Sequence, residues 1–325
     1  MRIAVAIHDP PVWTIPSAEV ERIARALPHD RVVDARDPSA RLAAFADADV
    51  LFATRISAAE FAAARDVRWI HSSAVGVGGL LPPAVVESPV LVTNARGVHS
   101  DTIAEHAIAL LLALRRQVPA AVAHQASRTW AQSELYVRAV APLAQTRMLI
   151  VGLGSIGTRV ARLAAGLGMP VAAVRRRPLE PVPAGVRRVV GPEELVGSLA
   201  DADVVVLALP RTDDTRSLIG EAELAAMKRS ALLINVSRGR LVDEAALVRA
   251  LETGRIAGAG LDAFQQEPLP SDHPLWRAPN TLITPHTATF SGDYWTPVVD
   301  LFLDNLARLK RAEPLVNVVD KRRGY

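Results

Sequence analysis

The chain has 325 residues, enough for two domains of about 150 residues each, and its 50% hydrophobic and 22% charged residues are typical of a globular protein, not a disordered one. Cysteine is absent, which excludes disulfides, thiolate metal sites and a cysteine nucleophile, and we expect no metal site. The net charge of +3 is small and the basic residues are dispersed, so we expect no nucleic-acid partner.

The chain lacks the signals of a membrane or secreted protein. Its longest strongly apolar run, residues 107–114, is far shorter than the ~18 residues that a membrane span needs. The first residues are typical of a strand and not of a signal peptide. We therefore expect a soluble, cytoplasmic protein with no membrane partner.

Residues 1–98 alternate short β-like runs with alanine-rich helical stretches, which favours a parallel sheet. The predicted strands cover residues 3–7, 49–53, 69–71 and 90–93, and residues 17–27 have helical spacing. From residue 100 the pattern changes. A capping-box spacing from Thr102 to Glu105 opens an apolar helix that runs through Leu114, and we expect that helix to be buried.

Residues 147–286 hold the clearest run of strands. Their near-continuous apolar character is typical of strands covered on both faces, and they are predicted at 148–151, 171–174, 203–209, 231–236 and 282–284. A helix is predicted over 158–167, directly after the first of these strands, and the last long helix over 298–310.

Gly152, Gly154 and Gly157 form a Gly-x-Gly-x-x-Gly pattern between a predicted strand and a predicted helix. The first glycine permits a tight turn, the second lets the backbone approach a pyrophosphate, and the third lets helix and strand pack closely. Free N–H groups at the start of the helix that follows favour an anion, and Ser155 and Ile156 of the loop are expected to contact the cofactor. The pattern predicts a dinucleotide site; the alternative is a glycine-rich turn without a ligand.

The end of the second strand bears on the choice of cofactor. An NAD-selective site usually has a carboxylate there, which accepts from the ribose 2′-hydroxyl. In this chain the strand 171–174 ends in Arg175, Arg176 and Arg177. Guanidinium groups suit a phosphate. We therefore predict a preference for NADP(H), with NAD(H) as the alternative if the arginines form only a surface turn.

Three further polar segments follow β-like runs and contain Arg238, Asp262 with Glu267, and His286. Ligands of open α/β sheets bind at the carboxyl ends of the strands, so these side chains are expected to converge on one cleft. Singly, each has a structural alternative as a turn, a loop boundary or a buried histidine. Together, in this order and after these strands, they favour a catalytic site.

With these motifs in view, the chain resembles the D-isomer-specific 2-hydroxyacid dehydrogenases, in particular the glyoxylate/hydroxypyruvate reductase-like branch. The resemblance rests on the glycine loop 152–157, on Asn-Val-Ser-Arg-Gly at 235–239, on residues 262–268 and on Pro285-His286. It implies an α/β protein in which a Rossmann coenzyme domain, 99–287, is inserted into a flavodoxin-like substrate domain, 1–98 and 288–325. It also implies a homodimer.

The resemblance further implies a role for each catalytic residue. Arg238 would bind the substrate carboxylate and polarise the 2-keto oxygen, and His286 would protonate that oxygen as hydride reaches C2. Glu267 would pair with the imidazole. An adjacent carboxylate raises the pKa of an imidazole, which keeps its proton-donating form available near neutral pH. Asp262 would bind near the nicotinamide carboxamide.

The remaining contacts are implied in the same way. Cofactor contacts are expected from five more residues: Leu209, Pro210, Thr215, Val236 and Ser237. Residues 69–77 resemble the substrate loop, in which the N–H groups of Val75 and Gly76 would bind the carboxylate. Arg55 lies on a loop that is expected to face the substrate.

The expected function is reduction of a small 2-keto acid, such as glyoxylate or hydroxypyruvate, to a D-2-hydroxy acid. One alternative is a dehydrogenase of the same fold with phosphite or formate as the donor; a formate enzyme would be expected to have glutamine in place of Glu267. The other is a non-catalytic co-regulator that senses a dinucleotide. The sequence leaves the identity of the acid open.

Overall fold

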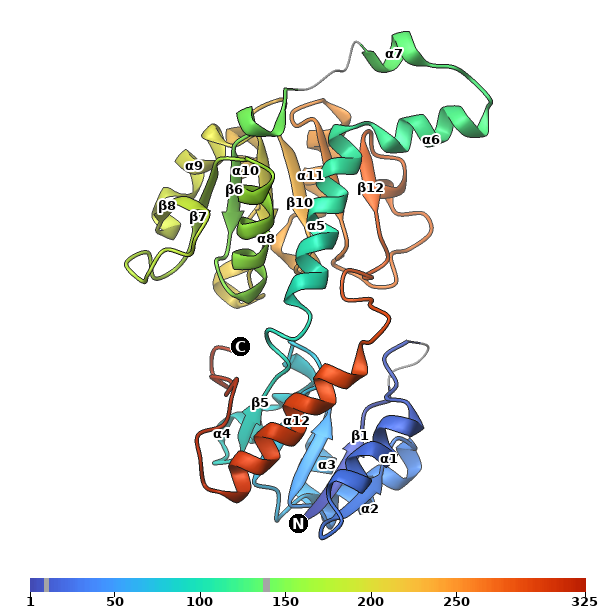
Figure 1. Ribbon diagram of the computed structural model, residues 1–325, viewed down its shortest axis with the longest axis vertical. Coiled ribbons are helices and arrows are strands. Elements are labelled where there is room, and N and C mark those ends of the chain that lie inside the picture. The colour runs from blue at the N-terminus through green and yellow to red at the C-terminus, as the bar shows by residue number, and fades with distance from the viewer. Residues whose placement is uncertain (9–11, 137–140) are drawn as a thin grey trace. The chain divides into compact units, whose positions relative to one another are not determined.

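The computed structural model describes residues 1–8, 12–136 and 141–325. The chain forms two compact units (Figure 1). The first unit consists of Met1–Val98 and Ser291–Tyr325, and the second of His99–Phe290. The chain therefore passes from one unit to the other twice, after Val98 and after Phe290.

The first unit is built on a five-stranded parallel sheet in the order β2-β1-β3-β4-β5, the flavodoxin-like order. Its strands are β1 (Arg2–Ala6), β2 (Arg31–Asp34), β3 (Val50–Ala53), β4 (Trp69–His71) and β5 (Leu91–Thr93). The sequence analysis missed β2, because its two apolar residues are flanked by the charged Arg31 and Asp34. The other four strands are confirmed to within a residue or two.

Helices cover both faces of this sheet. Successive residues of a strand point to opposite faces, so Ile3 and Val5 join one core and Ala4 and Ala6 the other. The first core is closed by α1 (Ser17–Ala26) and α12 (Trp295–Lys310). The second core is closed by α2 (Pro38–Ala46), α3 (Ala58–Ala63) and α4 (Pro83–Glu87).

The second unit is built on a seven-stranded parallel sheet in the order β12-β11-β10-β9-β6-β7-β8. Counted from β6, this is the Rossmann order 3-2-1-4-5-6 with β12 added at one edge. Its strands are β6 (Met148–Val151), β7 (Val171–Val174), β8 (Val186–Val190), β9 (Val204–Leu207), β10 (Leu232–Asn235), β11 (Gly258–Leu261) and β12 (Thr281–Ile283). The strand order reverses between β6 and β9, where such sheets bind their ligands.

Two strands of this sheet, β8 and β11, were not predicted. Strand β8 carries two exposed arginines, and β11 contains Gly258 and Gly260, which weaken a strand pattern. Gly260 is required by packing. A Cβ there would lie 2.9 Å from Cδ1 of Ile234 and 3.1 Å from Cβ of Leu110. The glycine therefore lets the helix α5 approach the sheet.

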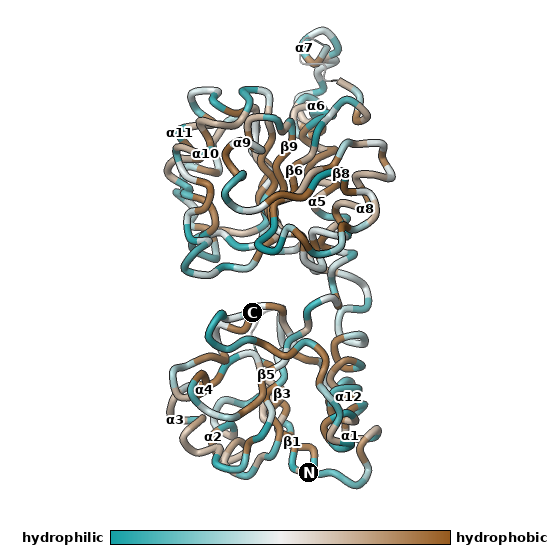
Figure 2. Tube along the Cα trace, turned by 90° about the vertical axis from the view of Figure 1, so that its left-hand side faces the viewer, coloured by the Kyte–Doolittle hydropathy of each residue, from teal (hydrophilic) through white to brown (hydrophobic). Residues whose placement is uncertain are grey.

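Two layers of helices enclose the second sheet, and hydrophobic residues gather along its strands (Figure 2). One face is covered by α5 (Ser100–Arg115) and α8 (Ser155–Gly166), and the other by α9 (Leu195–Asp201), α10 (Glu221–Ala226) and α11 (Glu244–Glu252). The expected burial of α5 is confirmed. Its predicted capping box is wrong, because the helix already begins at Ser100 and Thr102 lies inside its first turn.

Helices α6 (Val118–Ala126) and α7 (Gln132–Tyr136) extend away from the rest of the second unit (Figure 1). Within the described residues, no single helix is long and apolar enough to cross a membrane. The α5–α6 pair passes that test of length and composition together, with a 64° bend between them. Short 3-10 helices occupy Gly78–Leu80, Leu143–Gln145, Pro192–Glu194, Asp213–Thr215, Gly239–Leu241 and Pro274–Trp276.

Candidate active site

The glycine loop joins β6 to α8 at the point where the strand order reverses. Gly152 has φ +98°, and a Cβ there would lie 2.5 Å from the Ala208 carbonyl oxygen. A Cβ on Gly157 would lie 2.0 Å from the Gly152 carbonyl oxygen. These two glycines are therefore required by backbone shape and by close packing.

The middle glycine is different. A Cβ on Gly154 would have no atom within 4 Å, so the space above this residue is open. Helix α8 begins at Ser155, and no side chain caps it. N–H groups of the first turn, those of Ser155, Ile156 and Gly157, have no acceptor within the helix. Open space next to such donors fits the pyrophosphate of a dinucleotide.

The loops after β9 and β10 adjoin this glycine loop. The Gly152 backbone packs against Leu209, since a Cβ on the glycine would lie 2.7 Å from the leucine Cβ. The hydroxyl of Ser237, which follows the buried Val236, donates to the Leu209 carbonyl. Further along the first loop, the Thr215 hydroxyl donates to the Pro210 carbonyl at 2.9 Å. The structure thus brings these five predicted cofactor residues to neighbouring loops of one sheet edge.

The three arginines after β7 have different surroundings. Arg175 turns back on its own loop: its guanidinium donates to the carbonyls of Glu180 and Pro181, and its side chain is only 11% exposed. Arg177 pairs with the Glu180 carboxylate at 3.1 Å. Arg176 is exposed. Of the two predicted phosphate contacts, Arg175 therefore shapes the turn, and Arg176 presents its side chain at the surface.

A tight turn at the end of β10 positions Arg238. The Asn235 side chain is almost fully buried and holds the turn from both ends: its Oδ1 accepts from the Ser237 N–H at 3.1 Å, and its Nδ2 donates to the Arg238 carbonyl at 3.0 Å. Arg238 as a whole residue is half-buried, and its guanidinium donates to the Ser237 carbonyl at 2.7 Å. One nitrogen of the guanidinium is thereby fixed by the turn itself.

Gly239 joins this turn to the loop that follows β11. A Cβ on Gly239 would lie 1.8 Å from the carbonyl carbon of Phe264 and 2.3 Å from the nitrogen of Gln265. Any larger residue would push the two loops apart. The absence of a side chain at Gly239 therefore brings Arg238 close to the segment that carries Glu267.

Glu267 and His286 are hydrogen-bonded. His286 Nδ1 lies 2.6 Å from Glu267 Oε2, while Glu267 Oε1 accepts from the Phe264 N–H at 2.9 Å. The His286 side chain is 40% exposed and the Glu267 side chain 35% exposed, so both are partly accessible to solvent. Because Nδ1 faces the carboxylate, Nε2 is the nitrogen left to donate a proton elsewhere.

The charges of this group are coupled. Burial alone would raise the pKa of Glu267, but the hydrogen bonds from His286 and from the Phe264 N–H, with the charge of Arg238, outweigh it and hold that pKa below its usual value. Burial lowers the pKa of Arg238, and the Glu267 carboxylate opposes this shift. The charges of Arg238, Glu267 and His286, the three predicted catalytic residues, therefore influence one another.

Asp262 lies beneath the His286 loop and is 2% exposed. Its carboxylate accepts from the Thr284 hydroxyl at 2.6 Å, from the Thr287 N–H at 2.9 Å and from the Ala288 N–H at 3.0 Å. These bonds hold both sides of the turn at which His286 has φ +53°, a left-handed conformation that is uncommon for a residue with a side chain. In the structure Asp262 thus orders the loop of the imidazole, and its predicted nicotinamide contact stays a prediction.

The sequence analysis missed His106, on α5. Its Nε2 lies 2.9 Å from Thr284 Oγ1 and 3.5 Å from Asp262 Oδ1, so it extends the same network. The signal in the sequence is a single imidazole within an apolar helix, a pattern that more often marks a satisfied histidine than a site.

The predicted substrate residues of the first unit share one region of that unit. A Cβ on Gly79 would lie 2.8 Å from the Thr54 carbonyl oxygen and 3.3 Å from Cβ of Arg55, so the Arg55 loop adjoins the loop of Val75 and Gly76. The Val75 carbonyl accepts from Nδ2 of Asn94 at 2.9 Å. These loops follow β3 and β4, neighbouring strands of the sheet.

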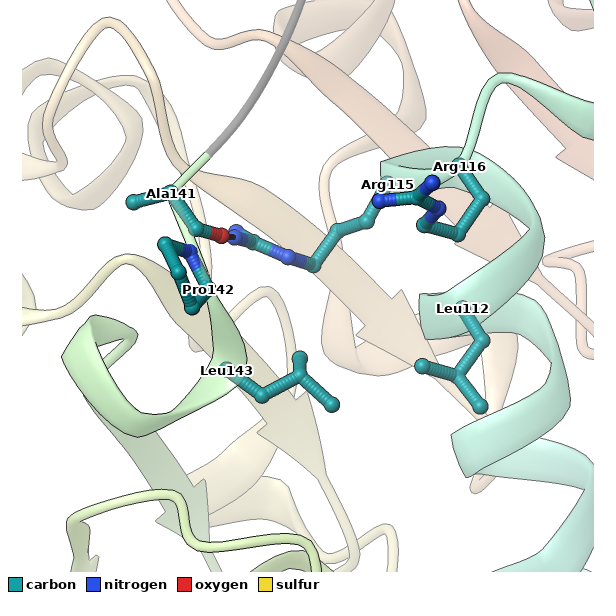
Figure 3. A pocket seen from close by; sticks show the side chains of 6 residues that line it. All are labelled: Leu112, Arg115, Arg116, Ala141, Pro142 and Leu143. Carbon is teal, nitrogen blue, oxygen red and sulfur yellow. Dashed lines mark hydrogen bonds between the residues drawn. The ribbon is translucent and has the colours of Figure 1, made fainter.

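Two depressions on the second unit are not lined by Arg238, Glu267 or His286. A cavity of about 310 Å³ separates the end of α5 from residues 141–143; in it Arg115 reaches the Ala141 carbonyl (Figure 3). It contains none of the predicted site residues. A second, of about 360 Å³, is lined by Arg216, Ser217, Arg240, Gln265 and Gln266.

Known proteins are similar to this chain over more than half of its length. The family model of the D-isomer specific 2-hydroxyacid dehydrogenase NAD binding domain matches residues 108–288. A glyoxylate reductase from Korarchaeum cryptofilum is 37% identical over 270 residues, 82% of this chain and 80% of that protein. A glycerate dehydrogenase from Methylorubrum extorquens is 34% identical over 260 residues, 78% of this chain and 79% of that protein.

Solved structures of similar fold include the NADPH-dependent glyoxylate/hydroxypyruvate reductase from Sinorhizobium meliloti, in complex with NADP and sulfate. It is 27% identical, aligns with a TM-score of 0.84 and covers 99% of both chains.

Proposed function

Because this chain belongs to the family of D-isomer specific 2-hydroxyacid dehydrogenases, we propose that it reduces a small 2-keto acid to a D-2-hydroxy acid with NADPH. The observation that carries the proposal is the Arg238–Glu267–His286 group at the carboxyl edge of the sheet whose glycine loop fits a dinucleotide. The second unit is then the dinucleotide-binding domain and the first the substrate domain.

The cofactor would be held by the open space over Gly154 and the uncapped start of α8, with Leu209, Pro210, Thr215, Val236 and Ser237 on the adjoining loops. When bound, NADPH supplies a hydride to C2 of the keto acid. Asp262 would keep the imidazole loop in place beside it, and its proposed contact is the nicotinamide carboxamide.

Arg238 would hold the substrate carboxylate. A guanidinium offers parallel N–H groups that match the two oxygens of a carboxylate. The Arg238 guanidinium is already oriented, because one of its nitrogens donates to the Ser237 carbonyl. The same cation draws electron density toward the 2-keto oxygen. As C2 gains the hydride, the electron pair of the C=O bond moves to oxygen, which takes a proton from Nε2 of His286. Glu267 stabilises the imidazolium before the transfer and orients the ring.

The preference for NADPH is supported by the arginines after β7. No carboxylate occurs at the end of that strand, where one would repel a 2′-phosphate. Arg176 would contact the phosphate, with Arg175 holding the turn. The Sinorhizobium meliloti relative was solved with NADP.

Glyoxylate and hydroxypyruvate are the substrates we propose first, since relatives are named for glyoxylate and glycerate chemistry. In the first unit, the N–H groups of Val75 and Gly76 and the side chain of Arg55 would bind substrate. The Glu267–His286 pair argues against a formate donor and against a non-catalytic co-regulator, neither of which requires it.

A homodimer is proposed from exposed apolar side chains. Trp130 is 89% exposed and Tyr136 78% exposed, both on the α6–α7 extension of the second unit. Aromatic side chains of this kind are common anchors of interfaces.

An initial-rate panel tests the function. Purified protein is assayed for reduction of glyoxylate, hydroxypyruvate, pyruvate and a bulkier 2-keto acid, each with NADPH and with NADH. Formate and phosphite are assayed separately as hydride donors, with the oxidised cofactors. We expect the highest kcat/KM for a two- or three-carbon keto acid with NADPH. Turnover with formate or phosphite alone, or no turnover with any keto acid, would contradict the proposal.

A further inference from the structure

A second carboxylate–imidazole pair lies behind the active-site loop. Glu244, the first residue of α11, is 8% exposed, and its Oε1 accepts from the Gln265 N–H at 2.6 Å. Its other oxygen, Oε2, faces Nε2 of His273 at 3.4 Å. Neither residue belongs to the proposed reaction, and neither was singled out by the sequence.

The orientation of His273 is fixed by its own loop. Its Nδ1 accepts from the Leu275 N–H at 3.3 Å, which leaves Nε2 to carry the proton toward Glu244. The backbone N–H of His273 in turn donates to the Pro270 carbonyl at 3.0 Å. Glu244 is therefore approached from two sides by donors that do not depend on each other.

The peptide between Phe264 and Gln265 is the junction of the site. The Phe264 N–H donates to Glu267, whereas the next N–H, that of Gln265, donates to Glu244. Gly239 packs directly on the same peptide. Two successive N–H groups thus bind two different carboxylates, and the orientation of Glu267 toward its imidazole depends on where this peptide is held.

Burial and neighbouring groups shift the pKa of Glu244 in opposite directions. Burial, Glu267 and Asp243 raise its pKa, and the Gln265 N–H and His273 lower it; burial prevails and the pKa is raised. A buried carboxylate of this kind has a cost that its hydrogen bonds must offset. The two polar partners of this buried acid, the Gln265 N–H and His273, both lie on the segment between β11 and β12 that carries Glu267.

We propose that Glu244, supported by His273, is a positioning residue that holds the Phe264–Gln265 peptide and thereby orients Glu267 toward His286. The inference rests on the proposed function, because it concerns the same reaction. It predicts that Glu244 acts on the chemical step and not on cofactor binding, since it contacts no part of the glycine loop. A misplacement of about 1 Å can cost ~100-fold in rate.

The test compares Glu244→Ala, Glu244→Gln and His273→Gln with Asp203→Ala as the matched control. Asp203 is also a carboxylate that accepts a hydrogen bond from a backbone N–H, that of Arg147. It directly precedes β9 and so lies at the amino ends of the strands, away from the candidate site. We expect Glu244→Ala to lower kcat ~10–100-fold with KM and the Kd for NADPH within about twofold. Glu244→Gln keeps an acceptor oxygen and should recover kcat to within about fivefold, with His273→Gln in between.

A readout that does not need turnover separates this inference from the proposed function. The nitrogen chemical shift of His286 Nδ1, which reports its hydrogen bond to Glu267, should change in Glu244→Ala and stay as in the wild type in Asp203→Ala. An inactive wild type would refute the function, while the NMR comparison would still decide the inference. Equal losses of kcat in Glu244→Ala and Asp203→Ala, equal losses in Glu244→Ala and Glu244→Gln, or an unchanged His286 Nδ1 chemical shift in Glu244→Ala would overturn the inference.

Discussion

The carboxylate of Glu267 and the ring of His286 come from loops after different strands, yet Oε2 of the first lies 2.6 Å from Nδ1 of the second. The pair is formed because Asp262 holds the loop of His286 and the Phe264 N–H holds the Glu267 carboxylate. The proposed proton transfer from His286 depends on that convergence.

Replacing His286 by alanine should remove the proton donor and leave the fold intact. Its side chain is 40% exposed, so the melting temperature should change little. A positioned acid contributes ~10²–10⁴ in rate, and kcat should fall by that factor while the Kd for NADPH is kept. His29→Ala, at an exposed histidine before β2, is the control and should behave as wild type. A kcat within tenfold of wild type would assign the proton transfer to another group.

The pH dependence of stability should differ between the wild type and Glu267→Gln. The pKa of Glu267 is lowered in the folded protein, so the stability it contributes is fully present above its ordinary pKa of about 4.3 and is lost as the pH falls through the lower, folded value. In urea unfolding, the wild type should exceed Glu267→Gln in unfolding free energy at pH 7, and the gap should close toward pH 3. A difference in unfolding free energy that stays constant from pH 7 to pH 3 would show that protonation of Glu267 does not affect stability.

The glycine loop offers a paired test of the cofactor site. Gly154→Ala adds a methyl group to open space, so the protein should fold normally but bind NADPH at least ~10-fold more weakly. Gly157→Ala forces a Cβ against the Gly152 carbonyl and should cost about 1–3 kcal/mol of stability, as overpacking does. Thermal unfolding with and without NADPH measures both effects. If Gly154→Ala kept full affinity, the pyrophosphate would have to bind elsewhere.

Cofactor preference should depend on one arginine of the three. Arg176→Ala should raise the Kd for NADPH by about tenfold and leave that for NADH unchanged, because only NADPH carries the 2′-phosphate. Arg177→Ala is the control, since Arg177 is engaged with Glu180 and should matter little. Arg175→Ala should weaken both cofactors through the turn it holds. Equal effects of Arg176→Ala on the two cofactors would contradict the assignment.

Acid should weaken the first unit through His71. This ring is fully buried in the core beside Phe52 and Trp69, its Nδ1 lies 2.6 Å from Thr93 Oγ1, and burial lowers its pKa to about 3. In the unfolded chain the ordinary pKa of about 6.5 returns, so the unfolded state binds the proton first. Relative to His71→Leu, the wild type should lose stability as the pH falls from 6.5 toward 3, by up to about 1.4 kcal/mol per unit. Parallel curves for the two proteins would refute this.

The α6–α7 extension should determine the oligomeric state. Trp130→Ser with Tyr136→Ser should raise the dimer dissociation constant at least ~10-fold in sedimentation experiments. Leu179→Ser is the matched control, because Leu179 is 99% exposed on another part of the second unit. A wild type that sediments as a monomer would contradict the homodimer itself.

The sequence determined much of this molecule by local pattern. Apolar runs marked most strands of both sheets, because a strand covered on both faces must be apolar throughout. The glycine spacing identified the loop after β6, because a tight turn and a close helix leave no room for a Cβ. The segments of Arg238, Glu267 and His286 could be recognised since each follows a strand of a parallel sheet. Strands β2, β8 and β11 were not predicted, because charged residues or glycines interrupt their apolar pattern.

The tertiary structure decided what each side chain contacts. Spacing alone could not show that Arg175 folds back on its loop, that the carboxylate of Asp262 is occupied by the His286 loop, or that His106 joins it. Nor could it identify Glu244, which resembles any acidic residue at the start of a helix. These relations join segments that are distant along the chain, and a hydrogen bond between them depends on how strands and loops pack. Local propensity carries no information about that packing.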